Sequence, residues 1–196
     1  MLYNKNLFIY CLVVFVFLFG QANAQQQKLL KQNWKAGIQL FGVGTNYEIP
    51  IASQTSINFE ASVNYGFATK DSRFSFYGTP INEVSDDLTQ VIAPAFSTEI
   101  RQYYNLKKRV RNNKSTLNNS GSFFSLTGGV KPKGFYSKNG TDELNFSFIP
   151  AWGMQRNVGK RINLDGRFGF GATYGNESKE WKGSINIRLG VAYVIK

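Results

Sequence analysis

The sequence predicts an all-β protein, a single eight-stranded antiparallel transmembrane β-barrel. Three observations lead to this fold class. Apolar and polar residues alternate with a period of two over long segments, which indicates strands. No segment beyond the first two dozen residues has 18 consecutive apolar residues, so no helix is expected to span a membrane. Aromatic residues, 17 Phe, 10 Tyr and 3 Trp, gather near the ends of the alternating segments.

The first 24 residues have the pattern of a secretory signal peptide. Lys5 precedes an apolar run, residues 7–19, and Ala22-Asn23-Ala24 follows it, so we expect cleavage near Ala24. The run is shorter than the ~20 residues of a transmembrane helix, although a signal anchor is an alternative. Cys11, the single cysteine, leaves with the signal. Residues 25–33 then form a polar leader, and residues 34–196 form the outer-membrane β-barrel domain.

Seven strands follow from the alternation itself. A typical one is residues 161–174, in which Leu164, Phe168 and Phe170 alternate with Asp165 and Arg167. The predicted strands are 34–46, 55–67, 94–106, 121–133, 143–154, 161–174 and 181–195. In the first of these the pattern blurs at residues 41–44, where we expect a glycine bend or bulge.

An eighth strand is required because an open sheet edge in lipid leaves backbone groups unpaired. Single-chain bacterial barrels have an even number of strands, eight being the smallest. We place this strand at residues 73–79, where Arg73-Phe74-Ser75-Phe76-Tyr77 alternates. With a last strand that ends in the periplasm, the connections 47–54, 80–93, 134–142 and 175–180 lie outside. The connections 68–72, 107–120 and 155–160 lie inside.

Alternation alone does not separate a membrane barrel from a soluble exported one, because the two differ in which face is polar. The polar face carries charged residues of both signs. They favour a membrane barrel, because in its narrow interior they would fill the space and neutralise one another. The expected lumen charge network is Glu60, Glu99, Arg101, Asp165, Arg167 and Arg188. The aromatic residues near strand ends, among them Tyr103 and Phe123, suit the girdles of a membrane barrel. The alternative explanation for the charges is a solvated strand face. The alternative explanation for the aromatic residues is their ordinary preference for strands.

Two blocks of the sequence carry a resemblance to a known family. They are residues 101–109 (RQYYNLKKR) with Asn118-Asn119-Ser120-Gly121, and residues 150–159 (PAWGMQRNVG) leading into a glycine-rich strand. In these blocks the chain resembles the small outer-membrane β-barrel proteins of Bacteroidota, which share the OmpA/OmpX-like eight-stranded barrel. The resemblance implies a bacterial outer-membrane location. It implies no catalytic residue.

Several kinds of chemistry are excluded or disfavoured by composition. The chain contains no histidine, which excludes imidazole bases and histidine metal ligands. One cysteine excludes internal disulfides and thiolate zinc sites. Glu83, Asp86 and Asp87 lie close enough in sequence to hold a weak calcium ion, but a solvated acidic loop is the better interpretation. We therefore expect no metal, no cofactor and no enzymatic activity.

Five cations in eight residues make the most distinctive surface feature of a chain with a formal net charge of +11. These candidates for polyanion contact are Lys107, Lys108, Arg109, Arg111 and Lys114. They suit phosphates of lipopolysaccharide or polyanions of the cell wall, or they form a solvated connection. Export argues against nucleic acid as a partner.

The function predicted from sequence is that of a non-catalytic outer-membrane barrel with a plugged polar interior and a structural or interaction role. Its expected partners are outer-membrane lipid and the barrel-assembly machinery, and we expect a monomer. The alternatives are a soluble lipocalin-like barrel that binds an apolar ligand, and a narrow channel.

Overall fold

A computed structural model of the protein describes residues 29–68, 89–138 and 143–195. The predicted signal peptide, the predicted strand at 73–79 and the acidic residues Glu83, Asp86 and Asp87 lie outside these ranges. Among the described residues, no helix is long and apolar enough to cross a membrane.

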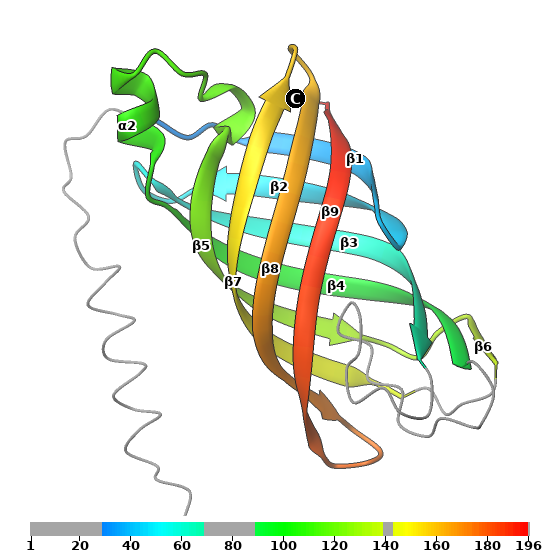
Figure 1. Ribbon diagram of the computed structural model, residues 1–196. Helices are drawn as coiled ribbons and strands as arrows, with labels where there is room; N and C mark the ends of the chain where they lie inside the picture. The colour runs from blue at the N-terminus through cyan, green and yellow to red at the C-terminus, as the bar shows by residue number, and fades with distance from the viewer. Residues whose placement is uncertain (1–28, 69–88, 139–142, 196) are drawn as a thin grey trace, which may run out of the picture.

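The described residues form nine strands, one α-helix and one 3₁₀ turn (Figure 1). The strands are β1 (Asn33–Gln39), β2 (Gly42–Pro50), β3 (Thr55–Ala68), β4 (Thr89–Tyr103), β5 (Gly121–Lys131), β6 (Tyr136–Lys138), β7 (Asn145–Val158), β8 (Ile162–Gly175) and β9 (Trp181–Val194). Helix α2 (Leu106–Arg111) and the 3₁₀ turn η2 (Leu117–Asn119) both lie between β4 and β5. The sequence therefore predicted an all-β chain correctly.

The strands make one antiparallel sheet that rings round on itself. Each of β1, β2, β3, β4, β5, β7, β8 and β9 pairs with two of the others, and the first strand of this set pairs with the last, Ala36 facing Tyr193. The short strand β6 pairs with residues 90–92 of β4, beyond the part of β4 that β5 covers. In Figure 1 the strands β1–β4 cross behind β5, β7, β8 and β9.

The predicted strand 34–46 is wrong, because this segment contains parts of two strands. Residues 40 and 41 form a two-residue turn between β1 and β2, and Gln39 pairs with Gly42, Ile38 with Val43 and Gly37 with Gly44. The blurred pattern at 41–44 therefore marks a hairpin and not a bend within one strand. This hairpin supplies the eighth strand of the ring without the segment 73–79.

The extra hairpin changes which connections share an end of the ring. The terminal end is defined here as the end where β1 begins and β9 ends, and it carries connections 51–54, 104–120 and 159–161. At the opposite, distal end lie connections 40–41 and 176–180, together with the end of β3, the start of β4, the end of β5 and the start of β7. The predicted side of 47–54 is therefore wrong, whereas 107–120 and 155–160 lie with the termini as expected. Residues 69–72 of the predicted connection 68–72 lie outside the described ranges.

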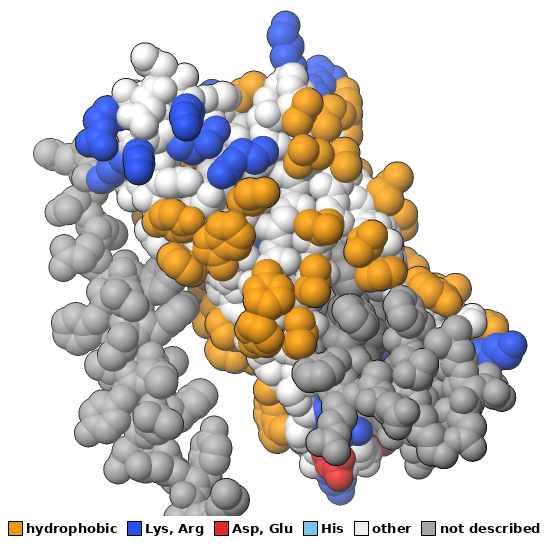
Figure 2. Space-filling model, in the orientation of Figure 1, with side chains coloured by type: hydrophobic (Ala, Val, Ile, Leu, Met, Phe, Trp, Pro, Cys, Tyr) orange, Lys and Arg blue, Asp and Glu red, His pale blue; other side chains and the backbone are white. Residues whose placement is uncertain are grey.

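The two faces of the sheet have opposite polarity. Among the described residues, 22 polar or charged residues are buried, against eight hydrophobic ones. In contrast, 31 large hydrophobic residues are exposed, and Figure 2 shows many of them over the strands. The interior of the ring is therefore polar and its outer wall is apolar, the reverse of an ordinary soluble sheet protein.

A small hydrophobic cluster closes the interior at the terminal end. It consists of Leu30, Tyr103, Leu106 and Phe123, each at most 1% exposed. Leu30 brings the segment before β1 onto the ring, and Leu106 anchors the start of α2. Tyr103 and Phe123 lie inside, so assigning them to an aromatic girdle is wrong. The alternation of the strand explains the position of Tyr103. It follows the inward-facing Glu99 and Arg101 of β4 at spacings of two residues, so it also faces inward.

Candidate functional site: the interior charge network and the surfaces around it

Eight ionisable side chains from six strands meet in the interior of the ring. Four are cations and four are anions, so the formal charges cancel. The cations are Lys35 of β1, Arg101 of β4, Arg167 of β8 and Arg188 of β9. The anions are Glu48 of β2, Glu60 of β3, Glu99 of β4 and Asp165 of β8. Alternation places them inside because each strand turns every second residue inward.

The network begins near the terminal end with Lys35 and Glu48. Lys35 Nζ lies 3.1 Å from Glu48 Oε2, and the two side chains are 2% and 0% exposed. The second carboxylate oxygen of Glu48 accepts hydrogen bonds from Ser56 Oγ at 2.7 Å and from the Tyr103 hydroxyl at 2.8 Å. This carboxylate is buried and fully engaged, which is the condition under which a buried charge is tolerated.

Arg101 links this first pair to the middle of the network. Its guanidinium lies 2.7 Å from Glu99, 3.9 Å from Glu48 and 4.0 Å from Asp165. It also lies over the ring of Phe123, 4.6 Å from the ring centroid. The planar guanidinium suits this position because it can donate to several acceptors at once and stack on an aromatic face.

The network continues toward the distal end through two more arginines. Arg167 lies 2.7 Å from Glu99 and 3.8 Å from Glu60. Arg188 donates to Glu60 and lies 3.6 Å from Asp165. Every anion therefore lies within ion-pair distance of two cations.

Gln155 of β7 joins the network to the cap at the terminal end. Its side-chain oxygen accepts from Lys35 Nζ at 2.8 Å and from Arg101 Nη1 at 3.2 Å. Its amide nitrogen donates to the carbonyl oxygen of Asn118 at 2.6 Å. One side chain thus connects the ion pairs with η2 in the 104–120 connection.

The structure brings together all six charged residues that the sequence suggested for the interior. Two further members, Lys35 and Glu48, were not included. Lys35 alternates with Trp34 and Ala36, so its inward direction could have been read from the pattern. Glu48 was missed because residues 47–54 were interpreted as a loop, whereas β2 extends to Pro50.

Two small voids lie among the inward-facing side chains. One void of about 70 Å³ is lined by residues that include Glu60, Asn64 and Arg188, and another of about 20 Å³ lies beside Asp165 and Gln155. Such volumes hold a few water molecules at most.

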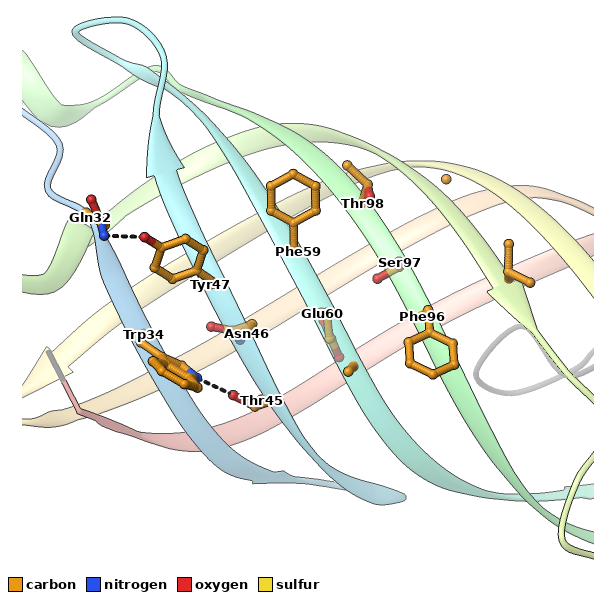
Figure 3. Close-up of a pocket in the computed structure, with 13 residues that line it drawn as sticks. Gln32, Trp34, Thr45, Asn46, Tyr47, Phe59, Glu60, Phe96, Ser97 and Thr98 are labelled. Atoms are coloured by element: carbon orange, nitrogen blue, oxygen red, sulfur yellow. Dashed lines mark hydrogen bonds between the residues drawn. The ribbon is translucent and has the colours of Figure 1, made fainter.

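A wide concavity lies on the outer wall of the ring. It has a volume of about 1020 Å³ and spans β1 to β5. Figure 3 shows Trp34, Tyr47, Phe59 and Phe96 around it, with the Trp34 indole donating to Thr45 Oγ1 at 2.7 Å. We call this concavity the outer groove. Small outward residues form its floor: Thr45, Ala61, Thr98 and Gly128.

The predicted basic run lies at the terminal end, on α2 and the residues after it. Lys107, Lys108, Arg111 and Lys114 are exposed, and Figure 2 shows Lys and Arg side chains gathered in this region. Arg109 differs, since its guanidinium donates to the carbonyl oxygen of Ser115 at 2.7 and 3.1 Å. Arg109 therefore stabilises the loop, whereas the side chains of the other four cations extend into the surroundings.

Within the described ranges, His, Cys, Asp and Glu form no group of three or more that could hold a metal ion. The suggested calcium ligands Glu83, Asp86 and Asp87 lie outside these ranges. Comparisons with protein-family models, curated proteins and solved structures found no match to this chain.

Asn119 ties the leader to the cap at the terminal end. Its side-chain oxygen accepts from the backbone N–H of Lys31 at 2.8 Å, and its amide donates to the Lys31 carbonyl oxygen at 2.8 Å. Its backbone has a φ of 61°, in the left-handed region that Asn tolerates. These two hydrogen bonds resemble those between neighbouring strands. They hold the segment before β1 in place, so that Leu30 stays in the hydrophobic cluster with Tyr103, Leu106 and Phe123.

We expect Asn119→Ala to release this leader. The substitution removes two hydrogen bonds and costs about 1–3 kcal/mol, so trypsin should cut after Lys31 faster than in the wild type. Asn113→Ala is the matched control, because Asn113 also has a positive φ of 51° and is exposed. Equal cleavage rates in the two variants would contradict the role given to Asn119.

Glu143 holds the connection 176–180 at the distal end. Its carboxylate accepts from the N–H groups of Glu177 and Ser178 and from the Ser178 hydroxyl, the last two at 2.9 Å. Burial on its own would raise the pKa of this carboxyl, but the Ser178 and Glu177 donors outweigh it and hold the pKa below its ordinary value of 4.5. The ionised form is therefore the one that the folded connection favours.

We expect this connection to loosen in acid. Because the folded pKa is depressed, the stabilisation is present above pH 4.5 and is lost as the pH falls through the folded pKa. Hydrogen exchange at the Glu177 and Ser178 amides, corrected for intrinsic rates, should lose protection on acidification. Glu143→Gln should remove that dependence, whereas Glu177→Gln, an exposed carboxylate in the same connection, should keep it. An unchanged acid response in Glu143→Gln would contradict the assignment.

Proposed function

We propose that this chain is a non-catalytic β-barrel protein of the bacterial outer membrane. In this proposal the eight long strands form a closed barrel that spans the membrane. The interior charge network plugs the barrel, and the protein serves a structural or interaction role at the cell surface. The proposal includes export with cleavage near Ala24, insertion by the barrel-assembly machinery and a monomeric state.

The observation that carries the proposal is the inverted polarity of the ring. Soluble monomers rarely expose contiguous apolar patches larger than a few hundred Å², whereas here large hydrophobic side chains lie exposed on every long strand of the ring. In a membrane barrel, apolar side chains face lipid and the lumen is polar. A lipid environment gives each exposed Phe, Leu and Val a favourable neighbour. Acyl chains would also fill the outer groove, whose walls are aromatic.

Two sets of exposed Tyr and Trp residues give further support. Near the terminal end they are Trp34, Tyr104 and Tyr193, and near the distal end they are Tyr65, Tyr136 and Trp181. Their polar atoms have partners in some cases, such as the Tyr104 hydroxyl, which accepts from Trp152 Nε1 of the middle of β7 at 2.9 Å. Aromatic residues with one apolar and one polar side are typical of both membrane–water interfaces.

The alternatives fit the described residues less well. A lipocalin-like barrel needs an apolar interior cavity for its ligand, but ion pairs and polar groups fill this interior. A narrow channel needs a continuous aqueous path, but paired charged side chains from six strands occupy this interior, and two voids among them have volumes of about 70 and 20 Å³. Two observations support a non-catalytic role. Each interior carboxylate forms ion pairs with interior cations, and the chain contains no histidine.

The orientation follows from the parity of the strands. Both described ends of the chain lie at the terminal end, which we assign to the periplasm as in other barrels with an even number of strands. The basic run then lies in the periplasm. It does not reach lipopolysaccharide in the outer leaflet, so the lipopolysaccharide contact considered for this run requires the opposite orientation.

Two measurements test the proposal. In cell fractionation, the native protein should stay with the outer membrane until detergent is added, whereas a soluble barrel would appear in the aqueous fraction. In planar bilayers, the purified wild type should give no stable single-channel steps. An Arg101/Arg167/Arg188 triple alanine variant should leak more, because it loses three of the four interior cations. Sizeable steps from the wild type would refute the plugged barrel and favour the channel.

A further inference from the structure

The terminal end of the ring carries cations without acidic neighbours. The segment 29–32 and the connections 51–54, 104–120 and 159–161 contain no Asp or Glu. They contain eight basic residues: Lys31, Lys107, Lys108, Arg109, Arg111, Lys114, Lys160 and Arg161. At the distal end the described connections are mixed, and Lys133 pairs with Glu177 at 2.6 Å. Among the connections that the structure describes, the excess of positive charge is therefore concentrated at the terminal end.

Exposed apolar side chains lie among these cations. Val110 of α2 and Leu117 of η2 are 47% and 43% exposed, although Leu106 of the same helix is buried. A polar polymer such as a glycan offers no favourable contact to these two side chains. A membrane interface does, because there apolar groups enter the acyl boundary while neighbouring Lys and Arg remain with the headgroups.

The neighbouring aromatic residues indicate the depth at which the cations lie. Tyr104 is exposed directly before α2 and accepts from Trp152 Nε1. On the opposite side of the ring, Arg161 Nη1 donates to the Tyr193 hydroxyl at 2.7 Å. Exposed Tyr and Trp mark the headgroup level of a bilayer. The basic residues next to them in the connections are then at the level of the lipid phosphates.

We propose that the terminal end binds the headgroups of anionic phospholipids in the adjoining leaflet, with Lys107, Lys108, Arg111 and Lys114 at the phosphates and Val110 and Leu117 in the interface. This inference rests on the proposed membrane-spanning function. It adds a lipid preference and names the surface that confers it. Phosphatidylglycerol is the simplest lipid with the required charge, and phosphatidylcholine is the matched lipid without net charge.

The test uses the folded mature protein in phosphatidylcholine nanodiscs, with spin-labelled phosphatidylglycerol or phosphatidylcholine as the probe. The wild type should immobilise the anionic probe at least about twofold more strongly, since each Lys or Arg near the surface adds to the attraction. Going from physiological salt to about 1 M salt shortens the Debye length from about 8 Å to about 3 Å and should abolish the preference.

Two triple variants locate the effect. Lys107/Lys108/Lys114→Gln should lose most of the preference, because these lysines are exposed at the terminal end. Lys133/Lys138/Lys179→Gln removes the same number of exposed lysines from the distal end and should keep it. An equal loss in both variants would overturn the inference, since net charge alone would then explain it.

The outcomes separate this inference from the function on which it rests. If neither probe is immobilised, the membrane-spanning proposal itself fails. If both probes are immobilised equally, the protein spans the membrane and the lipid preference is refuted. A third outcome is that the two probes behave alike while the wild type sediments with insoluble peptidoglycan and the Lys107/Lys108/Lys114→Gln variant does not. The terminal end would then bind a cell-wall polymer, and the inference is overturned.

Discussion

Lys35→Met should lower the free energy of unfolding by about 3–5 kcal/mol, because it leaves the Glu48 carboxylate buried without its nearest cation. Lys35 Nζ is 3.1 Å from Glu48 Oε2, whereas the next cation, Arg101, is 3.9 Å away. The measurement is urea unfolding of the protein folded into phosphatidylcholine vesicles, followed by tryptophan fluorescence.

The double variant Lys35→Met/Glu48→Gln is the informative control. It removes a matched pair and leaves three interior cations against three anions, so most of the loss should be recovered. Gln at position 48 can still accept from Ser56 and Tyr103, which donate to Glu48 in the wild type. If the double variant is as unstable as the single one, or less stable, charge balance is not what the interior requires.

Phe168→Arg should cost about 2–4 kcal/mol if the outer wall faces lipid, since that is the cost of a cation near the bilayer midplane. Phe168 lies at the middle of β8, is 44% exposed and packs edge-on against Phe170 with centroids 4.7 Å apart. The same vesicle unfolding measurement applies. In water the substitution would be nearly neutral, because an exposed arginine is well solvated.

Ile162→Arg provides the depth control on the same strand. Ile162 is the first residue of β8, beside the terminal end, and it is also exposed. Near the interface an arginine should cost only about 0–1 kcal/mol. Equal effects at residues 162 and 168 would argue against a bilayer around the ring, because only a membrane makes the cost depend on depth.

The direction of most side chains could be predicted from the sequence alone. In β8 the alternation placed Leu164 and Phe168 on one face and Asp165 and Arg167 on the other, and the structure has the same division. This works because side-chain direction in a strand has a period of two whatever the strand pairs with. The same rule, applied to Glu99 and Arg101, places Tyr103 inside. Its position near a strand end was a weaker guide.

The tertiary structure alone decided what the phase shift after Leu40 means. Outward residues are even-numbered in β1, such as Trp34 and Ile38, and odd-numbered in β2, such as Val43 and Thr45. A bulge within one strand and a turn between two strands both produce such a shift. Only the pairing of Ile38 with Val43 identifies the hairpin, and that pairing then fixes which connections share an end.

Six of the eight members of the charge network followed from the pattern, but the ion-pair partner of each did not. Lys35 meets Gln155, 120 residues away, and Arg188 meets Glu60, 128 residues away. Which inward side chains lie at the same height depends on the stagger of the strands around the ring. Stagger is a property of all eight pairings together, so no local segment of the sequence carries it.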